Sequence, residues 1–110
     1  MANPQKNKGD RHERDTASQF SAVLDREVPR IRAGWDDDRG DLELPGHIVE
    51  CKAHAQWRPQ EWLRDTTGKC RDGEVPIVVA KQPRGRSVAI LHLDDLLPML
   101  RAHLEREERP

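Results

Sequence analysis

Residues 41–52, which read DLELPGHIVECK, decide the fold of this chain. Apolar and polar residues alternate on both sides of the Pro45-Gly46 pair, and alternation of this kind is typical of half-buried strands. The Pro-Gly pair itself is a turn signal. The stretch therefore predicts a β-hairpin, with strands at residues 41–44 and 47–53.

The charged side chains of this hairpin form the strongest chemical pattern in the chain. Glu50 and Lys52 lie two residues apart in a strand, so they share a face, while Cys51 points away. Asp41 reaches the same face if the register places it near Glu50. Two carboxylates and a backbone carbonyl, such as that of Cys51, would offer the hard oxygen ligands that Mg²⁺ prefers. The E-x-K spacing by itself favours a simpler interpretation, an ion pair on a solvated strand.

A helix is predicted from Gly9 to Asp25, because apolar residues recur at helical spacing from Ala17 to Leu24. Glu13 lies four residues before Ala17 and shares that face. Burying a carboxylate costs several kcal/mol unless it is paired or binds a metal, so Glu13 is a candidate member of the site. The alternative is that Glu13 only complements the positive end of the helix macrodipole.

The rest of the chain predicts strands at residues 30–35, 75–80 and 87–93, a helix at 59–67, and a last helix capped by Asp94. Pro98 must lie in the first turn of that helix or mark its true start. The element order is then α-β-β-β-α-β-β-α, an α/β domain with a mixed central sheet flanked by helices. Residues 1–8 are expected to form a flexible basic N-terminus, 9–104 the single domain, and 105–110 a charged tail.

Composition excludes several classes of protein. The chain has 110 residues, enough for one domain, and 35% of them are charged. Its mean hydropathy is −0.93, and no apolar run approaches the length of a membrane span. The N-terminus lacks the apolar stretch of a secretory signal, so we expect a cytoplasmic protein with two reduced thiols, Cys51 and Cys70. A core this small would gain from dimerisation.

The charge balance does not by itself indicate a nucleic-acid-binding protein. The chain carries 19 basic and 20 acidic residues and has a net charge of −1. The basic residues nevertheless gather near the N-terminus, around residues 30–32 and around the predicted turn at 83–86. Basic patches of this kind can bind phosphate locally, although those at Arg84 and Arg86 would equally solvate a turn.

Five fragments in order resemble the PD-(D/E)XK nuclease superfamily, and within it most closely the archaeal-type Holliday junction resolvases, which viruses also encode. The fragments are Lys8-Gly9 with Glu13, Arg30-Ile31-Arg32-Ala33-Gly34, Gly40-Asp41-Leu42, Val49-Glu50-Cys51-Lys52, and the run Val75–Lys81. The resemblance covers most of residues 6–93. One departure is Trp35, which stands where the family often has a serine, so a hydroxyl contact there is not expected.

The resemblance implies a restriction-endonuclease-like fold and a metal-dependent endonuclease that cuts branched DNA, as a homodimer, in recombination or repair. The cofactor would be Mg²⁺, with Mn²⁺ as a substitute, and a viral protein would act in its bacterial host cell. Glu13, Asp41 and Glu50 would be the metal-site carboxylates, Glu13 directly or through water, and Lys52 the catalytic lysine. The residues expected to contact DNA are Lys6, Lys8, Arg11, Arg30, Arg32, Lys81, Arg84 and Arg86.

Three alternatives remain open at the level of the sequence. The same fold could cut other DNA, such as flaps, nicks or linear duplex, because the shape of the substrate is read by the dimer surface. The protein could also be a DNA-binding or scaffolding protein that has lost catalysis, although intact acidic residues and Lys52 argue against this. A structural interaction domain without a nucleic-acid role is the third alternative.

Overall fold

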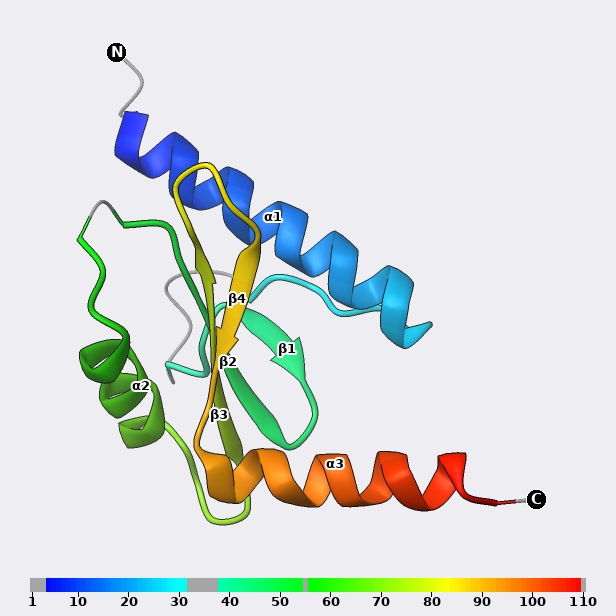
Figure 1. Cartoon of the computed structure of the whole chain (residues 1–110). Coiled ribbons are helices and arrows are strands. Elements are labelled where there is room, and N and C mark those ends of the chain that lie inside the picture. Colours follow the sequence, from blue (N-terminus) through cyan, green and yellow to red (C-terminus); the bar gives the residue numbers. More distant parts are fainter. Residues whose placement is uncertain (1–3, 32–37, 55, 110) are drawn as a thin grey trace.

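The computed structural model describes residues 4–31, 38–54 and 56–109 (Figure 1). Three helices and four strands follow one another along these residues. In chain order they are α1 Pro4–Leu24, β1 Leu42–Leu44, β2 His47–Lys52, α2 Pro59–Gly68, β3 Val75–Lys81, β4 Ser87–Ile90 and α3 Leu93–Glu107.

The strands form one mixed sheet in the order β1-β2-β3-β4. β1 and β4 are antiparallel to their neighbours, and the central strands β2 and β3 are parallel, with α2 as the connection between them. Parallel neighbours require such a crossover, and the two central strands are covered on both faces. The predicted α/β fold with a mixed sheet flanked by helices is therefore confirmed.

The core has two halves, one on each face of the sheet. Val79 and Val49 pack with Ala17 of α1, whereas Val78 packs with Trp62 of α2. Neighbouring residues of β3 point to opposite faces, so α1 and α2 cover opposite faces. Trp62 is 6% exposed and packs α2 against the sheet.

The hairpin at residues 41–52 matches its prediction closely. Leu42 pairs with Val49 and Leu44 pairs with His47, and the chain turns at Gly46 with a φ of +78°. A positive φ is easily reached by glycine, which has no Cβ to clash with the backbone. Both strands lie within one residue of the predicted bounds.

The first helix differs from its prediction at both ends. α1 begins at Pro4 rather than Gly9, so residues 4–8 are helical where a flexible segment was expected. Its buried face is formed by His12, Thr16 and Ala17, while Val23 is 76% exposed. Val23 instead borders a groove beside β4, because only the earlier turns of α1 lie over the core.

The predicted strand at residues 30–35 can be assessed only at its first two positions, because residues 32–37 lie outside the described part of the chain. Arg30 forms a single antiparallel bridge to Leu42. The N–H of Ile31 donates to the carbonyl of Asp41 at 2.9 Å, and the N–H of Glu43 donates to Pro29 at 2.8 Å. This segment therefore runs beside β1 and fixes the entrance to the hairpin.

The last helix also begins earlier and ends later than predicted. The carbonyl of His92, not Asp94, receives the first helical N–H groups, at 3.0 and 3.1 Å. β4 consequently ends at Ile90 rather than Leu93, because the chain has already turned into α3. Pro98 lies inside the helix, beyond the first turn where it was expected, and α3 continues to Glu107 through part of the predicted charged tail.

Among the described residues, no helix has both the length and the apolar character that crossing a membrane requires.

Candidate active site

The chain before β1 places the first acidic residue of the site. Asp41 directly precedes β1, and its N–H donates to the carbonyl of Val49 at 2.7 Å. Its side chain turns onto β2, where Oδ2 accepts the N–H of Cys51 at 2.7 Å. Gly40 makes this approach possible, since its φ is +86° and a Cβ there would lie 2.7 Å from the carbonyl oxygen of Val49.

Glu50 is the buried acidic residue of β2. It is 5% exposed and pairs with Val78 in the parallel ladder, so it shares the α2 face of the sheet with that residue. Lys69, directly after the end of α2, forms an ion pair with Glu50 and a second one with Asp38 at 2.9 Å. The buried carboxylate therefore has the ammonium of Lys69 as its partner.

A single pocket of about 360 Å³ brings the predicted site together. Glu13, Asp41, Glu50 and Lys52 all line it, from α1, from the entrance to β1 and from β2. Lys6, which was predicted to contact DNA, lines the same pocket. Glu13 lies 37 positions before Glu50 in the sequence, so this grouping depends on how α1 lies against β2.

Burial raises the pKa of both Asp41 and Glu50 above the ordinary range for carboxyls. Removal from water is the largest cause in each case, and the negative charge of a neighbouring acidic residue raises each pKa further; for Glu50 that neighbour is Asp41. For Asp41 that neighbour is Glu13, and for Glu50 the ion pair with Lys69 opposes the shift. A half-buried and a buried carboxyl that both resist ionisation, in one pocket, form a site where a divalent cation would be favourable.

The residues present fit a hard divalent cation in part. Asp41 and Glu50 supply carboxylate oxygens, the donors that Mg²⁺ prefers, and burial without enough positive charge indicates a place for a cation. Within the described ranges, no three His, Cys, Asp or Glu side chains already converge as ligands of one ion. Further ligands would have to come from backbone, water or substrate, as is usual for Mg²⁺.

Glu13 lies at the margin of the α1 core face rather than on it. Its carboxylate accepts a hydrogen bond from Nε of Arg30 at 3.1 Å, and Asp10 lies 3.6 Å from the same guanidinium. The side chain of Glu13 is 20% exposed, so this residue lies at the edge of the buried face that His12, Thr16 and Ala17 form. Arg30, which is predicted to contact the DNA backbone, pairs with both Glu13 and Asp10 in the structure.

Sequence reasoning missed Lys69 and its ion pair with Asp38. A basic residue just after a helix end is ordinarily explained by the helix dipole, so Lys69 carried no distinctive signal. Arg39 strengthens the link, because it pairs with Glu74 and donates to the carbonyl of Lys69 at 3.2 Å. These contacts tie the chain just before Asp41 to the end of α2, next to Glu50.

Cys51 is a packing residue rather than a reactive thiol. Burial, with the negative charges of Asp41 and Glu13 as further causes, raises the pKa of its thiol to about 12. The thiol therefore stays protonated at neutral pH, and its N–H, which holds Asp41, is the part of the residue that serves the site.

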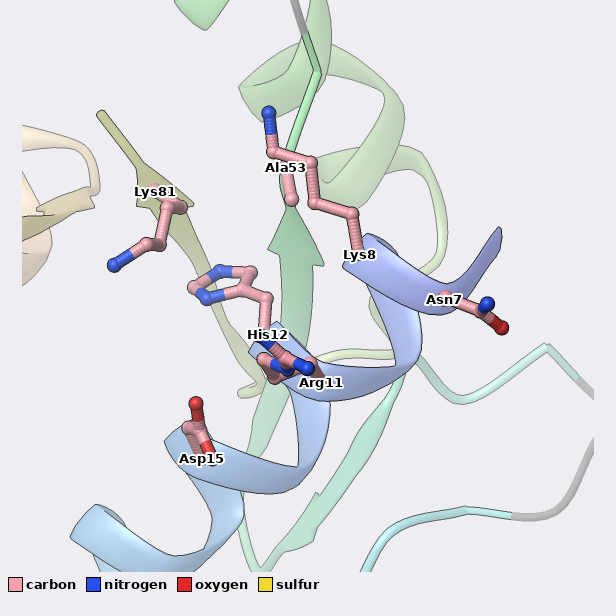
Figure 2. Close-up of a pocket in the computed structure, with 7 residues that line it drawn as sticks. All are labelled: Asn7, Lys8, Arg11, His12, Asp15, Ala53 and Lys81. Carbon is pink, nitrogen blue, oxygen red and sulfur yellow. The ribbon is translucent and has the colours of Figure 1, made fainter. Parts of the chain in front are cut away.

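A second pocket, of about 450 Å³, lies next to the first and is basic (Figure 2). Lys8 and Arg11 of α1 and Lys81 at the end of β3 line it. Ala53, which follows Lys52, borders both pockets. The buried ring of His12 anchors α1 here, because its Nε2 donates to the carbonyl of Val79 at 2.9 Å.

The other predicted DNA contacts are spread more widely. Arg84 and Arg86 are exposed in the β3–β4 turn, which begins directly after Lys81. Arg32 lies outside the described residues. Three of the eight predicted contacts, Lys8, Arg11 and Lys81, thus form one cationic surface beside the carboxylates.

Comparison with known proteins agrees with this arrangement at the level of family. The family model described as "phage putative PDDEXK endonuclease" matches residues 4–108 of the chain. No curated protein and no solved structure matches the chain. Because the match spans almost the whole chain, including Asp41, Glu50 and Lys52, the protein belongs to this phage family of the PD-(D/E)XK nuclease superfamily.

Proposed function

We propose that the protein is a metal-dependent DNA endonuclease that hydrolyses phosphodiester bonds in branched DNA, with the four-way junction as its substrate. The pocket that gathers Glu13, Asp41, Glu50 and Lys52 carries the nuclease part of this proposal. The resemblance to junction resolvases supports the choice of substrate. The protein would act in recombination or repair, in the cytoplasm of a bacterial host.

The acidic residues would hold the metal. Asp41, Glu50 and the carbonyl of Cys51 would bind Mg²⁺ or, in its place, Mn²⁺, and Glu13 would contribute directly or through water. When bound, the ion would supply positive charge that favours ionisation of water and offsets charge on the phosphate.

The other residues of the chain would position the reactants. In hydrolysis, water oxygen bonds to phosphorus, the bond from phosphorus to the leaving sugar oxygen breaks, and that oxygen takes up a proton. The ammonium of Lys52 would orient the water and a phosphate oxygen at the end of β2. Lys8, Arg11 and Lys81 would hold a neighbouring phosphate in the basic pocket.

The test compares a labelled four-way junction with a linear duplex built from the same arms, in Mg²⁺, in Mn²⁺ and in EDTA. We expect paired nicks near the branch that require metal. Glu50→Gln and Lys52→Ala should each lower the cleavage rate by about a hundredfold or more, because each removes charge from the reacting centre. Glu43→Gln, which changes an exposed acidic residue of β1, is the matched control and should cleave normally.

Each other outcome selects one of the alternatives. Equal cleavage of both substrates would keep the nuclease and reject junction specificity. A folded protein that binds DNA but cleaves neither substrate would be an inactive scaffolding protein. Absent or salt-insensitive DNA binding would reject a nucleic-acid role altogether, because phosphate contacts weaken as salt is added.

A further inference from the structure

The last helix carries an apolar stripe that its own chain leaves open. Leu93, Leu97, Leu100 and Leu104 are 63%, 51%, 44% and 55% exposed. None of the residues of α3, all of which the structure describes, is buried. The spacing of four, three and four residues places the leucines on one side of the helix, as in the seam of a coiled coil.

The position of α3 explains why the stripe is open. The helix starts below the sheet and extends away from it rather than covering a face (Figure 1). The radius of gyration of 15.0 Å reflects this extension, since a compact domain of similar length has a value of about 13 Å. Four leucines on a projecting helix form an apolar surface of the kind that marks an interaction site.

We propose that this surface, which we call the α3 seam (Leu93, Leu97, Leu100 and Leu104), binds the α3 seam of a second copy of the chain in an antiparallel helix pair. With Leu97 against Leu100 of the second copy at the centre, Leu93 meets Leu104 at each end. The arrangement is two-fold symmetric, so one self-complementary surface satisfies both copies.

The charges beside the seam favour this orientation. Asp94 follows Leu93 and Arg101 follows Leu100, on the same flank of the seam. In the antiparallel register, Asp94 of one copy lies opposite Arg101 of the other, and symmetry repeats the pair. A parallel pair would instead bring the two acidic first turns together and align the two helix dipoles unfavourably.

The size of the seam sets the affinity to expect. α3 has 15 residues, so the contact extends over roughly 22 Å. This is smaller than a standard interface, which buries about 800 Å² per partner, so we expect a dimer that dissociates in the micromolar range. The proposal does not depend on the nuclease function, and its test does not use DNA.

The test is sedimentation equilibrium of the whole chain across the micromolar range. The unmodified protein should be a monomer–dimer mixture, and Leu97→Glu should be a monomer with an unchanged circular dichroism spectrum. Met99→Glu, which changes another exposed apolar residue of α3 outside the seam, is the control and should still dimerise. A protein that is monomeric throughout, or a dimer that survives Leu97→Glu, would overturn the proposal.

A charge exchange tests the register. Asp94→Arg alone and Arg101→Asp alone each place two like-charged pairs in the dimer, so each should raise the dissociation constant roughly tenfold. Mixing the two variants pairs opposite charges again, so the mixture should form heterodimers with about the original affinity. A mixture no tighter than its components, or a dimer lost by Val23→Glu in the groove beside β4, would show a different surface and overturn the proposal.

Discussion

The half-buried carboxyl of Asp41 and the buried carboxyl of Glu50 have incomplete positive partners. Lys69 neutralises Glu50, but no such ion pair holds Asp41 among the described residues. Asp41 accepts the N–H of Cys51 at 2.7 Å and interacts with Glu50, and the charge of Lys52 acts on it more weakly. A buried charge without a full partner is costly, and active sites often retain such groups at the expense of stability. The pair therefore predicts that this protein is less stable than it would be without its acidic site.

The variant Asp41→Asn tests whether the ionised carboxyl lowers the stability of the protein, because that effect must depend on pH. The pKa of Asp41 is raised in the folded state, so its contribution to stability is present below the unfolded pKa and is lost as pH rises through the folded pKa. Asparagine keeps the oxygen that accepts the N–H of Cys51 and does not ionise. We expect the variant to be more stable at pH 7, by about 1.4 kcal/mol for each unit of pKa elevation, and the gain to vanish near pH 3.

Urea unfolding from pH 3 to 8 measures this difference, and Glu43→Gln serves as the exposed control. A variant that is no more stable at pH 7 than the unmodified protein would contradict the expectation. Mg²⁺ supplies a second readout without DNA, since it should raise the Tm of the unmodified protein and leave that of Asp41→Asn nearly unchanged.

The hairpin is the element on which the site depends. Gly40 lies where the incoming chain almost touches β2, and the hydrogen bond from the next residue, Asp41, to Val49 fixes that approach at 2.7 Å. The geometry requires both a positive φ and the absence of a Cβ. A change at this one position should therefore disturb both stability and the placement of Asp41.

Gly40→Ala should destabilise the protein by about 2–3 kcal/mol and reduce cleavage, because its Cβ would clash with the Val49 carbonyl at a strained φ. Gly46→Ala is the matched control, since its φ is +78° but nothing lies within 4 Å of its Cβ position. The free energy of unfolding of Gly46→Ala should fall by only about 1 kcal/mol, and this variant should keep its cleavage activity. Chemical denaturation and the junction assay measure both effects, and equal losses in the two variants would argue against the clash.

At the scale of the whole molecule, the net charge is −1, yet the protein has a local cationic surface. Lys8, Arg11 and Lys81 converge from α1 and β3 although the chain as a whole is slightly acidic. DNA binding that relies on this surface must be short-ranged, because at physiological salt charges are screened beyond about 8 Å. The protein should therefore bind DNA weakly and with a marked dependence on salt.

Removing any one of these three cations should lower the slope of log K against log salt by about one and weaken binding to junction and duplex alike. Arg14→Gln is the control, because Arg14 is an exposed cation of α1 that does not line the pocket. Fluorescence anisotropy over a salt series provides the measurement. An unchanged slope in Lys81→Gln together with a lower slope in Arg14→Gln would place the DNA elsewhere.

Local patterns in the sequence were sufficient for most of the central elements. Alternation around Pro45-Gly46 predicted the hairpin, and the apolar run at residues 75–80 predicted a strand. That strand is β3, which is central in the sheet and covered by a helix on each face. Helix ends were harder to predict. α1 extends back to Pro4 through polar residues. α3 begins at Leu93, with His92 rather than Asp94 as its N-cap residue, since capping depends on where the preceding strand ends.

The sequence by itself determined the α/β class, the hairpin and the candidate residues Asp41, Glu50 and Lys52, because alternation and turn signals act over a few residues. Only the tertiary structure decided that Lys69 neutralises Glu50, that Arg30 holds Glu13, and that Lys8 and Lys81 form one pocket. Those contacts join residues 17 or more positions apart. Their distances depend on how the helices cross the sheet, and no local pattern of residues encodes that geometry.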